Sequence, residues 1–274
     1  MANNYLIKNG TVVSVDKEIG VQHNCNILVQ DGIIKAIGSD IQSPDNIETI
    51  DATDHIVSPG FVDTHRHAWQ TQLKNITSDA LLPEYFLNIR NIYGSCYTPE
   101  DAYLGNLLGG LESIEAGITS LVDHCHLINS PSHADKLVEG LRDARIRATW
   151  CYGLYRNQKW TGVANGTVQD ETEPDWRLED AKRIKQQYFS SSTQTSLLRF
   201  GFAPAEIERY DLATSIAQFQ YGRELGAALI TGHISLGKLD RGVHFIRQLE
   251  SQKLLGPDLL FSHGASLQPD ELDA

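Results

Sequence analysis

From residue 59 onward, short apolar stretches alternate with amphipathic helical stretches, and this rhythm limits the fold more than any other feature of the sequence. The apolar stretches have strand length, and the intervals between them show the apolar spacing of helices. Such an alternation predicts a parallel sheet with right-handed crossovers. An open doubly wound sheet and a closed barrel both satisfy it. The expected strands are residues 60–65, 119–124, 147–152, 198–203, 228–233 and 259–263.

One of the helical intervals carries the local signals of a helix start. Thr98 offers an N-cap hydroxyl, Pro99 suits the first helical position, and Asp101 places a negative charge in the first turn. The glycines between Gly105 and Gly110 fall inside this helical spacing, so we do not interpret them as a phosphate-binding loop. Further helices are expected near residues 134–143, 178–188, 212–225 and 243–254.

The first 58 residues follow a different pattern, in which short apolar stretches are separated by turn-forming dipeptides. Asn9-Gly10 and Asp31-Gly32 each stand between two such stretches, and this context favours a β-hairpin. Two hairpins so close together predict a small antiparallel sheet with one buried face. We therefore expect two domains, residues 1–58 and residues 59–274.

The composition argues against several classes of protein. Thirty-five acidic and 23 basic residues give a net charge of -12, which does not supply the basic face of a nucleic-acid binder. No apolar run approaches the roughly 20 residues of a membrane helix, and the start of the chain lacks the basic and apolar regions of a signal peptide. The four cysteines form no CxxC pair, which favours a reducing cytoplasm. We expect a cytoplasmic protein that acts on a small molecule, without a nucleic-acid or membrane partner.

Histidines carry the sharpest chemical signal. His65 and His67 fall at the end of the first expected strand, where side chains two residues apart share a side. Taken alone, such a pair is more often structural than metal-binding. His233 and His263 close the fifth and sixth expected strands, and the carboxyl ends of parallel strands converge on one face of a barrel. Imidazoles gathered at one face suit zinc or iron better than magnesium or calcium.

A second pair, His124 and His126, closes the second expected strand. Three alternatives stay open for each, which are contact with substrate, a hydrogen bond to a ligand histidine, and no role in the site. His126 lies further along the strand end, so we expect it to be the one that contacts substrate. Histidines in hairpin, strand-entry or helix contexts are expected to be structural, namely His23, His55, His133 and His244.

Residues near the histidines complete the candidate site. Trp69 and Gln70 directly follow the first pair and are candidates for the substrate pocket, although Trp69 is equally suited to packing. Residues 157–175 break the strand–helix rhythm and form either a binding loop or a surface excursion. Cys125 and Cys151 fall at strand ends without a nucleophilic Cys–His arrangement, so we expect both to be buried.

Three stretches of the sequence resemble the amidohydrolase superfamily. They are Gly10-Thr11-Val12-Val13, Asp31-Gly32-Ile33-Ile34-Lys35-Ala36-Ile37-Gly38 and Ile56-Val57-Ser58-Pro59-Gly60-Phe61-Val62-Asp63-Thr64-His65-Arg66-His67. The last is the most specific, and it is similar to the branch that holds the cytosine, adenosine-type and guanine deaminases and the triazine hydrolases. The resemblance implies an α/β fold, an incomplete TIM (β/α)8-type barrel of about six βα units with a small N-terminal β-sandwich portion.

The resemblance also implies roles for individual residues. His65, His67 and His233 would bind one divalent transition-metal ion, with zinc as the expected metal and iron as the alternative. His263 would orient the activated water or hold the substrate, and His263 and His126 would carry the catalytic proton transfers. The implied reaction is hydrolysis of a carbon–nitrogen bond other than a peptide bond, in which metal-activated hydroxide attacks a small heterocyclic or amide substrate. Many relatives are dimers or larger, so a homo-oligomer stays open.

Two departures from the branch leave alternatives open. The branch usually has a Glu three residues after the fifth-strand histidine, and here that position is Leu236. General acid–base catalysis commonly contributes about 10²–10⁴ in rate, so either an imidazole moves the proton or the leaving group needs little protonation. The chain also lacks counterparts of the seventh and eighth strands and of the eighth-strand Asp, and so resembles a C-terminally truncated enzyme. The alternatives are a metal-dependent lyase or decarboxylase on the same fold, and a truncated, non-catalytic binding fragment.

Overall fold

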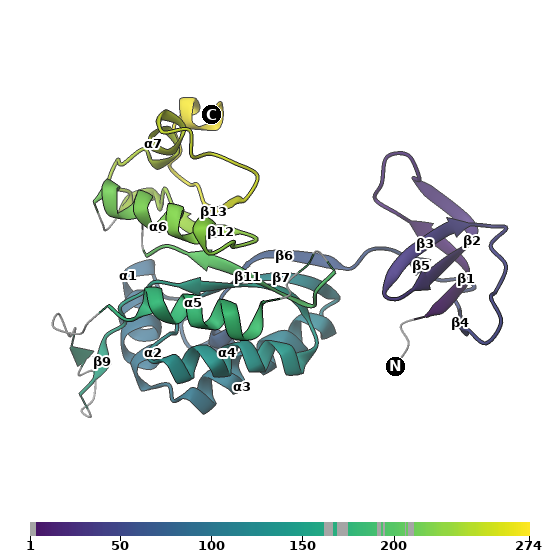
Figure 1. Ribbon diagram of the computed structural model, residues 1–274, viewed down its shortest axis with the longest axis horizontal. Coiled ribbons are helices and arrows are strands. Elements are labelled where there is room, and N and C mark those ends of the chain that lie inside the picture. Colours follow the sequence, from purple (N-terminus) through teal and green to yellow (C-terminus); the bar gives the residue numbers. More distant parts are fainter. Residues whose placement is uncertain are drawn as a thin grey trace. The chain divides into compact units, whose positions relative to one another are not determined.

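The computed structural model describes residues 4–161, 167–168, 175–190, 193, 195–205, 207 and 211–274. The chain divides into two compact units, Met1–Phe61 and Val62–Ala274, each with its own sheet (Figure 1). The assignment of residues 1–58 to part of a β-sandwich stays a prediction.

The first unit contains a five-stranded mixed sheet made of β1 (Tyr5–Val13), β2 (Val21–Gln30), β3 (Ile33–Gly38), β4 (Glu48–Asp51) and β5 (Ile56–Val57). β1 pairs with β2 and β2 with β3 in antiparallel fashion, whereas β4 and β5 run parallel to β1. The expected antiparallel sheet is therefore right for the first three strands and wrong for the last two. The buried residues Val12, Cys25, Ile27 and Val29 form the core of this unit.

The two expected hairpins have different outcomes. Asp31 and Gly32 both have positive φ, 53° and 72°, and they join β2 to β3 as a two-residue turn. Asn9 and Gly10 instead lie inside the continuous strand β1, where the register with β2 shifts on both sides of Gly10, so the first hairpin is wrong. A β-carbon on Gly10 would lie 2.8 Å from Val57 Cγ2. The glycine therefore serves the close packing of β5 on β1.

The second unit contains a six-stranded sheet of β6 (Phe61–Arg66), β7 (Ile118–Cys125), β8 (Arg147–Gly153), β11 (Leu198–Ala203), β12 (Ile230–Ile234) and β13 (Leu259–His263). The strand order is β13-β12-β11-β8-β7-β6. Each pair of neighbouring strands from β7 through β8, β11 and β12 to β13 is parallel. All six expected strands are present. Although β6 and β13 are the two edges, His65 Nδ1 and Ser262 Oγ lie 2.7 Å apart. The sheet therefore curls until its edges meet at one end, as expected for an incomplete TIM (β/α)8-type barrel.

Helices alternate with these strands. Figure 1 shows α3, α4 and α5 side by side along one face of the sheet. The longer helices are α3 (Pro99–Glu115), α4 (Pro131–Ala144), α5 (Arg177–Tyr188), α6 (Leu212–Glu224) and α7 (Phe245–Ser251), and the shorter ones are η1 (Ala68–Leu73), α1 (Leu82–Tyr85), η2 (Phe86–Tyr93), α2 (Gly94–Cys96), η4 (Gly237–Leu239) and α8 (Pro269–Leu272). No helix in the described part of the chain is both long and apolar enough to cross a membrane.

Helix α3 begins as the sequence predicts and packs closely against the segment that follows β6. Thr98 Oγ1 accepts a hydrogen bond from the Asp101 amide at 3.2 Å, which completes the N-terminal cap. A β-carbon on Gly105 would lie 2.6 Å from the carbonyl oxygen of Trp69. Glycine at this position thus lets α3 pack closely against η1. This packing fixes the segment that directly follows His65 and His67.

The segment of residues 157–175 is only partly described. Lys159–Trp160 (β9) and Thr167–Val168 (β10) pair as two short antiparallel strands, which corrects the expectation of a segment without secondary structure. Residues 162–166 and 169–174 lie outside the described residues. The role of this segment as a binding loop stays a prediction.

Candidate metal centre

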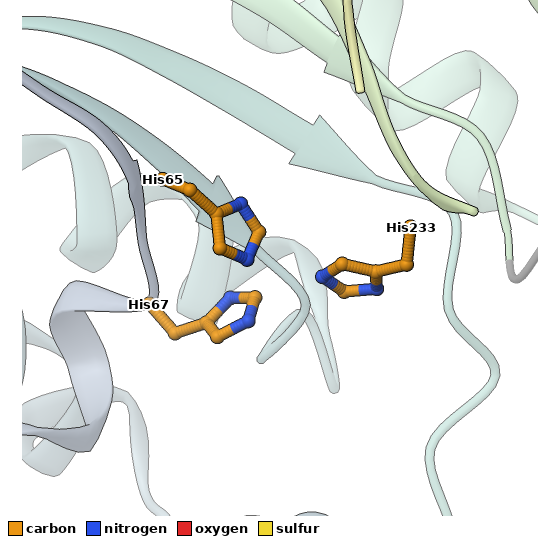
Figure 2. A group of neighbouring side chains, drawn as sticks. All are labelled: His65, His67 and His233. Atoms are coloured by element: carbon orange, nitrogen blue, oxygen red, sulfur yellow. The ribbon is translucent and has the colours of Figure 1, made fainter. Parts of the chain in front are cut away.

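Three histidines from two strands meet at one end of the curled sheet. His65 lies in β6, His67 directly follows β6, and His233 lies in β12. Their ring centroids are 4.8 Å (His65–His67), 5.0 Å (His65–His233) and 5.3 Å (His67–His233) apart. One ligand nitrogen from each ring lies within 4.8 Å of those of the other two. Figure 2 shows the three rings turned toward a common point.

Hydrogen bonds on the Nδ1 side set the orientation of the first two rings. His67 Nδ1 lies 2.6 Å from the carbonyl oxygen of His124, so this nitrogen carries the proton and donates it. The His67 Nε2 atom is consequently the unprotonated nitrogen. His65 Nδ1 makes a 2.7 Å hydrogen bond with Ser262 Oγ on the opposite edge of the sheet. Metal-binding histidines usually have such a partner on the nitrogen that does not face the metal.

The surroundings keep these imidazoles neutral. Burial, together with the neighbouring His233 and His263, lowers the pKa of His65 to about 4. Burial is also the main reason that the pKa of His67 lies well below its ordinary value, with His233 and His65 adding to the effect. A neutral imidazole is the form that binds a metal ion, so protons compete weakly for this site near neutral pH.

The donor set fits a transition-metal ion. Zinc–nitrogen bonds are about 2.0–2.1 Å long, so three nitrogens within 4.8 Å of one another can share one ion after a small side-chain movement. Three imidazole nitrogens suit zinc or iron rather than magnesium or calcium, which prefer oxygen. The neutral rings of His65 and His67, the backbone-anchored tautomer of His67 and the shared focus make the three histidines a candidate metal site.

A cavity of about 320 Å³ opens beside the three histidines. It is lined by His65, His67, Gln70, Leu82, Tyr85, Phe86, Arg90, His126, His233, Leu236 and His263. The structure thus places the expected site residues Gln70, His126 and His263 at the same cavity as the three candidate ligands. The His263 ring lies 5.1 Å from His233 and 5.7 Å from His65.

Trp69 lies behind the cavity rather than in its wall. Its side chain is completely buried, and its Nε1 atom donates a 3.0 Å hydrogen bond to His126 Nδ1. Of the two roles expected for Trp69, this geometry favours packing and does not support substrate contact. Because the indole nitrogen is a donor only, His126 Nδ1 is the acceptor and the proton of the neutral ring sits on Nε2.

His124 also lies behind the cavity. Its ring is fully buried and stacks on His233 at 4.3 Å, and its Nε2 atom is 2.8 Å from the Tyr155 hydroxyl. Its backbone carbonyl anchors His67. This geometry favours a positioning role over substrate contact.

The remaining histidines and the cysteines lie outside the cavity wall. His133 is buried between Ser130 and Tyr97, while His23, His55 and His244 are exposed and hydrogen-bond to nearby groups. Cys125 and Cys151 are fully buried, as expected, and burial raises the pKa of both thiols well above the ordinary value. No residue of these two groups touches the cavity.

The cavity wall contains no carboxylate among the described residues. Leu236, at the position where the resemblance leads us to expect a Glu, lines the cavity with an apolar side chain. The ionisable groups in the wall are therefore the imidazoles, the phenol of Tyr85 and the guanidinium of Arg90.

Sequence reasoning missed two contributors, Arg90 and Tyr85. Both come from the helical segment formed by α1 and η2, for which the sequence analysis made no prediction. The available signal was a basic residue inside the apolar helical stretch Phe86–Tyr93. Ser262 was also missed, because its partner His65 is 197 residues away in the sequence.

Comparison with known proteins supports this fold. No family model matches the chain. A 5'-deoxyadenosine deaminase from Methanosarcina barkeri is 28% identical over 272 residues, a match that covers 98% of this chain and 59% of the relative. This chain therefore spans about 59% of the length of that relative.

Two solved structures share the architecture. A triazine hydrolase from Arthrobacter aurescens superposes with a TM-score of 0.80 at 19% identity, covering 98% of this chain and 62% of that structure. An adenosine deaminase from Xanthomonas campestris, solved with bound zinc, gives a TM-score of 0.77 at 18% identity and covers 98% of this chain and 60% of that structure. The chain is thus similar in sequence to a deaminase and in fold to a triazine hydrolase and an adenosine deaminase.

Proposed function

We propose that this chain carries the metal site of a hydrolase that cleaves a carbon–nitrogen bond other than a peptide bond in a small heterocyclic or amide substrate, as a deaminase does. One observation carries the proposal: three imidazoles with a common focus border a cavity of about 320 Å³. That volume lies at the lower end of the range for small-molecule sites, about 300–1,000 Å³. Curated relatives named as deaminases support the choice of reaction.

His65, His67 and His233 would hold one divalent transition-metal ion, for which zinc is our proposal. A bound zinc ion supplies a water-derived nucleophile at neutral pH by lowering the pKa of water. The deaminase structure with bound zinc supports this choice of metal. The His67 tautomer leaves Nε2 as the ligand atom, since Nδ1 donates to the His124 carbonyl.

We assign the polar contacts that assist proton transfer to His126 and His263. Trp69 Nε1 occupies the Nδ1 atom of His126, so the neutral His126 ring would donate a hydrogen bond from Nε2 to the substrate or leaving group. Burial, and secondly Arg90, lowers the pKa of His126 well below its ordinary value, which keeps this ring neutral. His263, at the end of β13, would accept a proton or hold the substrate. Because Leu236 supplies no carboxylate, the reaction would depend on these imidazoles or on a leaving group that needs little protonation.

Gln70 is the proposed substrate contact from the first histidine segment. Its Nε2 atom donates a 2.7 Å hydrogen bond to the Tyr85 hydroxyl, which fixes the amide in the cavity wall. A fixed amide can distinguish hydrogen-bond donors from acceptors on a heterocyclic ring. We keep Trp69 as the residue that positions His126.

The alternative lyase or decarboxylase activity has less support, because the relatives are named as deaminases and hydrolases. A non-catalytic binding fragment is the remaining alternative, since the chain spans only part of the length of its relatives. A reducing cytoplasm stays our expected compartment, and a homo-oligomer stays open.

Metal content and ammonia release test the proposal together. Elemental analysis of the purified protein should show about one zinc or iron per chain, and ammonia should be released from at least one member of a panel of aminopurines, aminopyrimidines and aminotriazines. The variants His65→Ala and His67→Ala should lose both properties. His23→Ala is the matched control, because His23 is exposed and lies in the first unit. A folded protein that binds no transition metal under any loading condition would contradict the proposal.

A further inference from the structure

A buried cation forms part of the cavity wall. Arg90 lies in η2, is only 8% exposed, and lines the cavity together with His67 and His126. Helix η2 is a π-helix, a rare conformation that occurs frequently at functional sites. The guanidinium group stays protonated at any physiological pH. This arginine therefore places a permanent positive charge beside the candidate metal site.

The contacts of Arg90 do not neutralise that charge. Its Nη1 atom donates a 3.3 Å hydrogen bond to the carbonyl oxygen of His126, and its guanidinium carbon lies 5.0 Å from the centre of the Tyr155 ring. Both partners are uncharged. The Nε atom is buried without a hydrogen-bond partner, and Arg90 forms no ion pair within the described part of the chain. Burial of an arginine without a counter-ion is unfavourable.

The rest of the cavity wall supplies no negative charge among the described residues. It contains imidazoles, one amide, one phenol and apolar side chains, but no carboxylate among the described residues. The wall as a whole is thus electropositive, and a divalent cation at the three histidines would add to its charge. Such a cavity favours an anionic ligand.

We propose that the substrate carries a carboxylate group that binds Arg90, in addition to the carbon–nitrogen bond that is hydrolysed. This proposal rests on the proposed function only for the carbon–nitrogen bond that is hydrolysed. The recognition of the carboxylate is argued independently, from Arg90 and the cavity wall. A carboxylate matches the planar fork of a guanidinium. The volume of about 320 Å³ suits a single heterocyclic ring with one acidic substituent. The substrate class is therefore a small amino-heterocycle with a carboxylate on its ring.

A pair of matched probes tests the proposal by binding. Isothermal titration calorimetry of the purified protein with cytosine-5-carboxylate and with cytosine-5-carboxamide compares an anion with a neutral group of similar shape. The wild-type protein should bind the carboxylate on the order of 10- to 100-fold more tightly, the range expected for a hydrogen bond to a charged group. Arg90→Met should remove this preference, and Arg90→Lys, which keeps the charge but not the fork, should retain part of it.

Arg177→Met is the matched control, because Arg177 is also buried but does not line the cavity. It should leave the preference unchanged. Equal binding of the two probes by the wild type, no binding of the carboxylate at millimolar concentration, or an unchanged preference in Arg90→Met would overturn the proposal. The wild-type comparison decides the matter even if Arg90→Met does not fold. Anion preference without ammonia release from any heterocycle would contradict only the proposed function, and ammonia release without anion preference would contradict only this inference.

Discussion

Replacement of Trp69 by Phe tests whether the indole nitrogen holds His126 in one tautomer. The Trp69 Nε1 to His126 Nδ1 hydrogen bond is 3.0 Å long and fully buried. Its removal leaves a buried acceptor without a partner, which costs about 1–3 kcal/mol of unfolding free energy. Lost packing of the smaller ring adds on the order of 1–2 kcal/mol. We expect Trp69→Phe to lower the unfolding free energy by about 2–5 kcal/mol, the sum of these two terms.

Trp150→Phe separates the two contributions. Trp150 is equally buried, and the only acceptor near its indole nitrogen in the described part of the chain is the weakly accepting thiol of Cys125. This variant loses the same ring atoms without losing a hydrogen bond to nitrogen or oxygen, so Trp69→Phe should be the more destabilised of the two by about 1–3 kcal/mol in urea unfolding. Nitrogen-15 NMR of labelled histidine should show a second tautomer of His126 only in Trp69→Phe. Equal destabilisation of the two variants, with an unchanged His126 spectrum, would refute the reasoning.

Three further perturbations have expected outcomes. Without metal, the unfolding free energy should level off above about pH 7 and fall from there toward pH 4. Burial lowers the folded-state pKa of His65 to about 4 and holds those of the neighbouring buried histidines well below the ordinary value, so the unfolded chain takes up protons first. Asp123, whose pKa burial raises to about 7, opposes this trend, since its contribution is lost as the pH rises from 3.8 through 7, but it is one group against several buried histidines. Urea unfolding midpoints that stay constant or fall as the pH rises from 4 toward neutrality would disprove this dependence of stability on histidine protonation. Ser262→Ala removes the 2.7 Å partner of His65 Nδ1 and should weaken zinc binding about 10- to 100-fold in a chelator competition assay, whereas unchanged affinity would exclude a role for this hydrogen bond. Gly105→Ala places a β-carbon 2.6 Å from the Trp69 carbonyl oxygen, so its melting temperature should drop, and a wild-type melting temperature would show that α3 can move away without cost.

The sequence was a good guide wherever a short stretch carries its own pattern. The six strands of the barrel unit, the cap at Thr98 and the turn at Asp31-Gly32 depend on residues a few positions apart. The spacing of His65 and His67 was likewise enough to predict that their rings lie close together at the end of β6. The metal-binding role of these residues stays a proposal.

A local sequence pattern gave a wrong prediction where contacts with a distant segment determine the backbone conformation. Asn9-Gly10 has the composition of a hairpin turn, yet β1 continues through it because Gly10 packs under Val57 and the Asn9 amide donates to Asn26 Oδ1 at 3.0 Å. These partners are separated from the dipeptide in the sequence, so the dipeptide alone could not reveal them.

From the sequence alone one can determine the βα alternation, the histidines at strand ends and the replacement of an expected acid by Leu236, because each depends on the identity or periodicity of nearby residues. The tertiary structure alone decided that Trp69 faces His126, that Ser262 holds His65 and that Arg90 enters the cavity wall. Each of these contacts joins segments that are distant in the sequence, and the contact between Ser262 and His65 forms only when the sheet curls and brings its edges together. Side-chain periodicity specifies which face a residue occupies, but it does not specify which residue from another segment lies opposite.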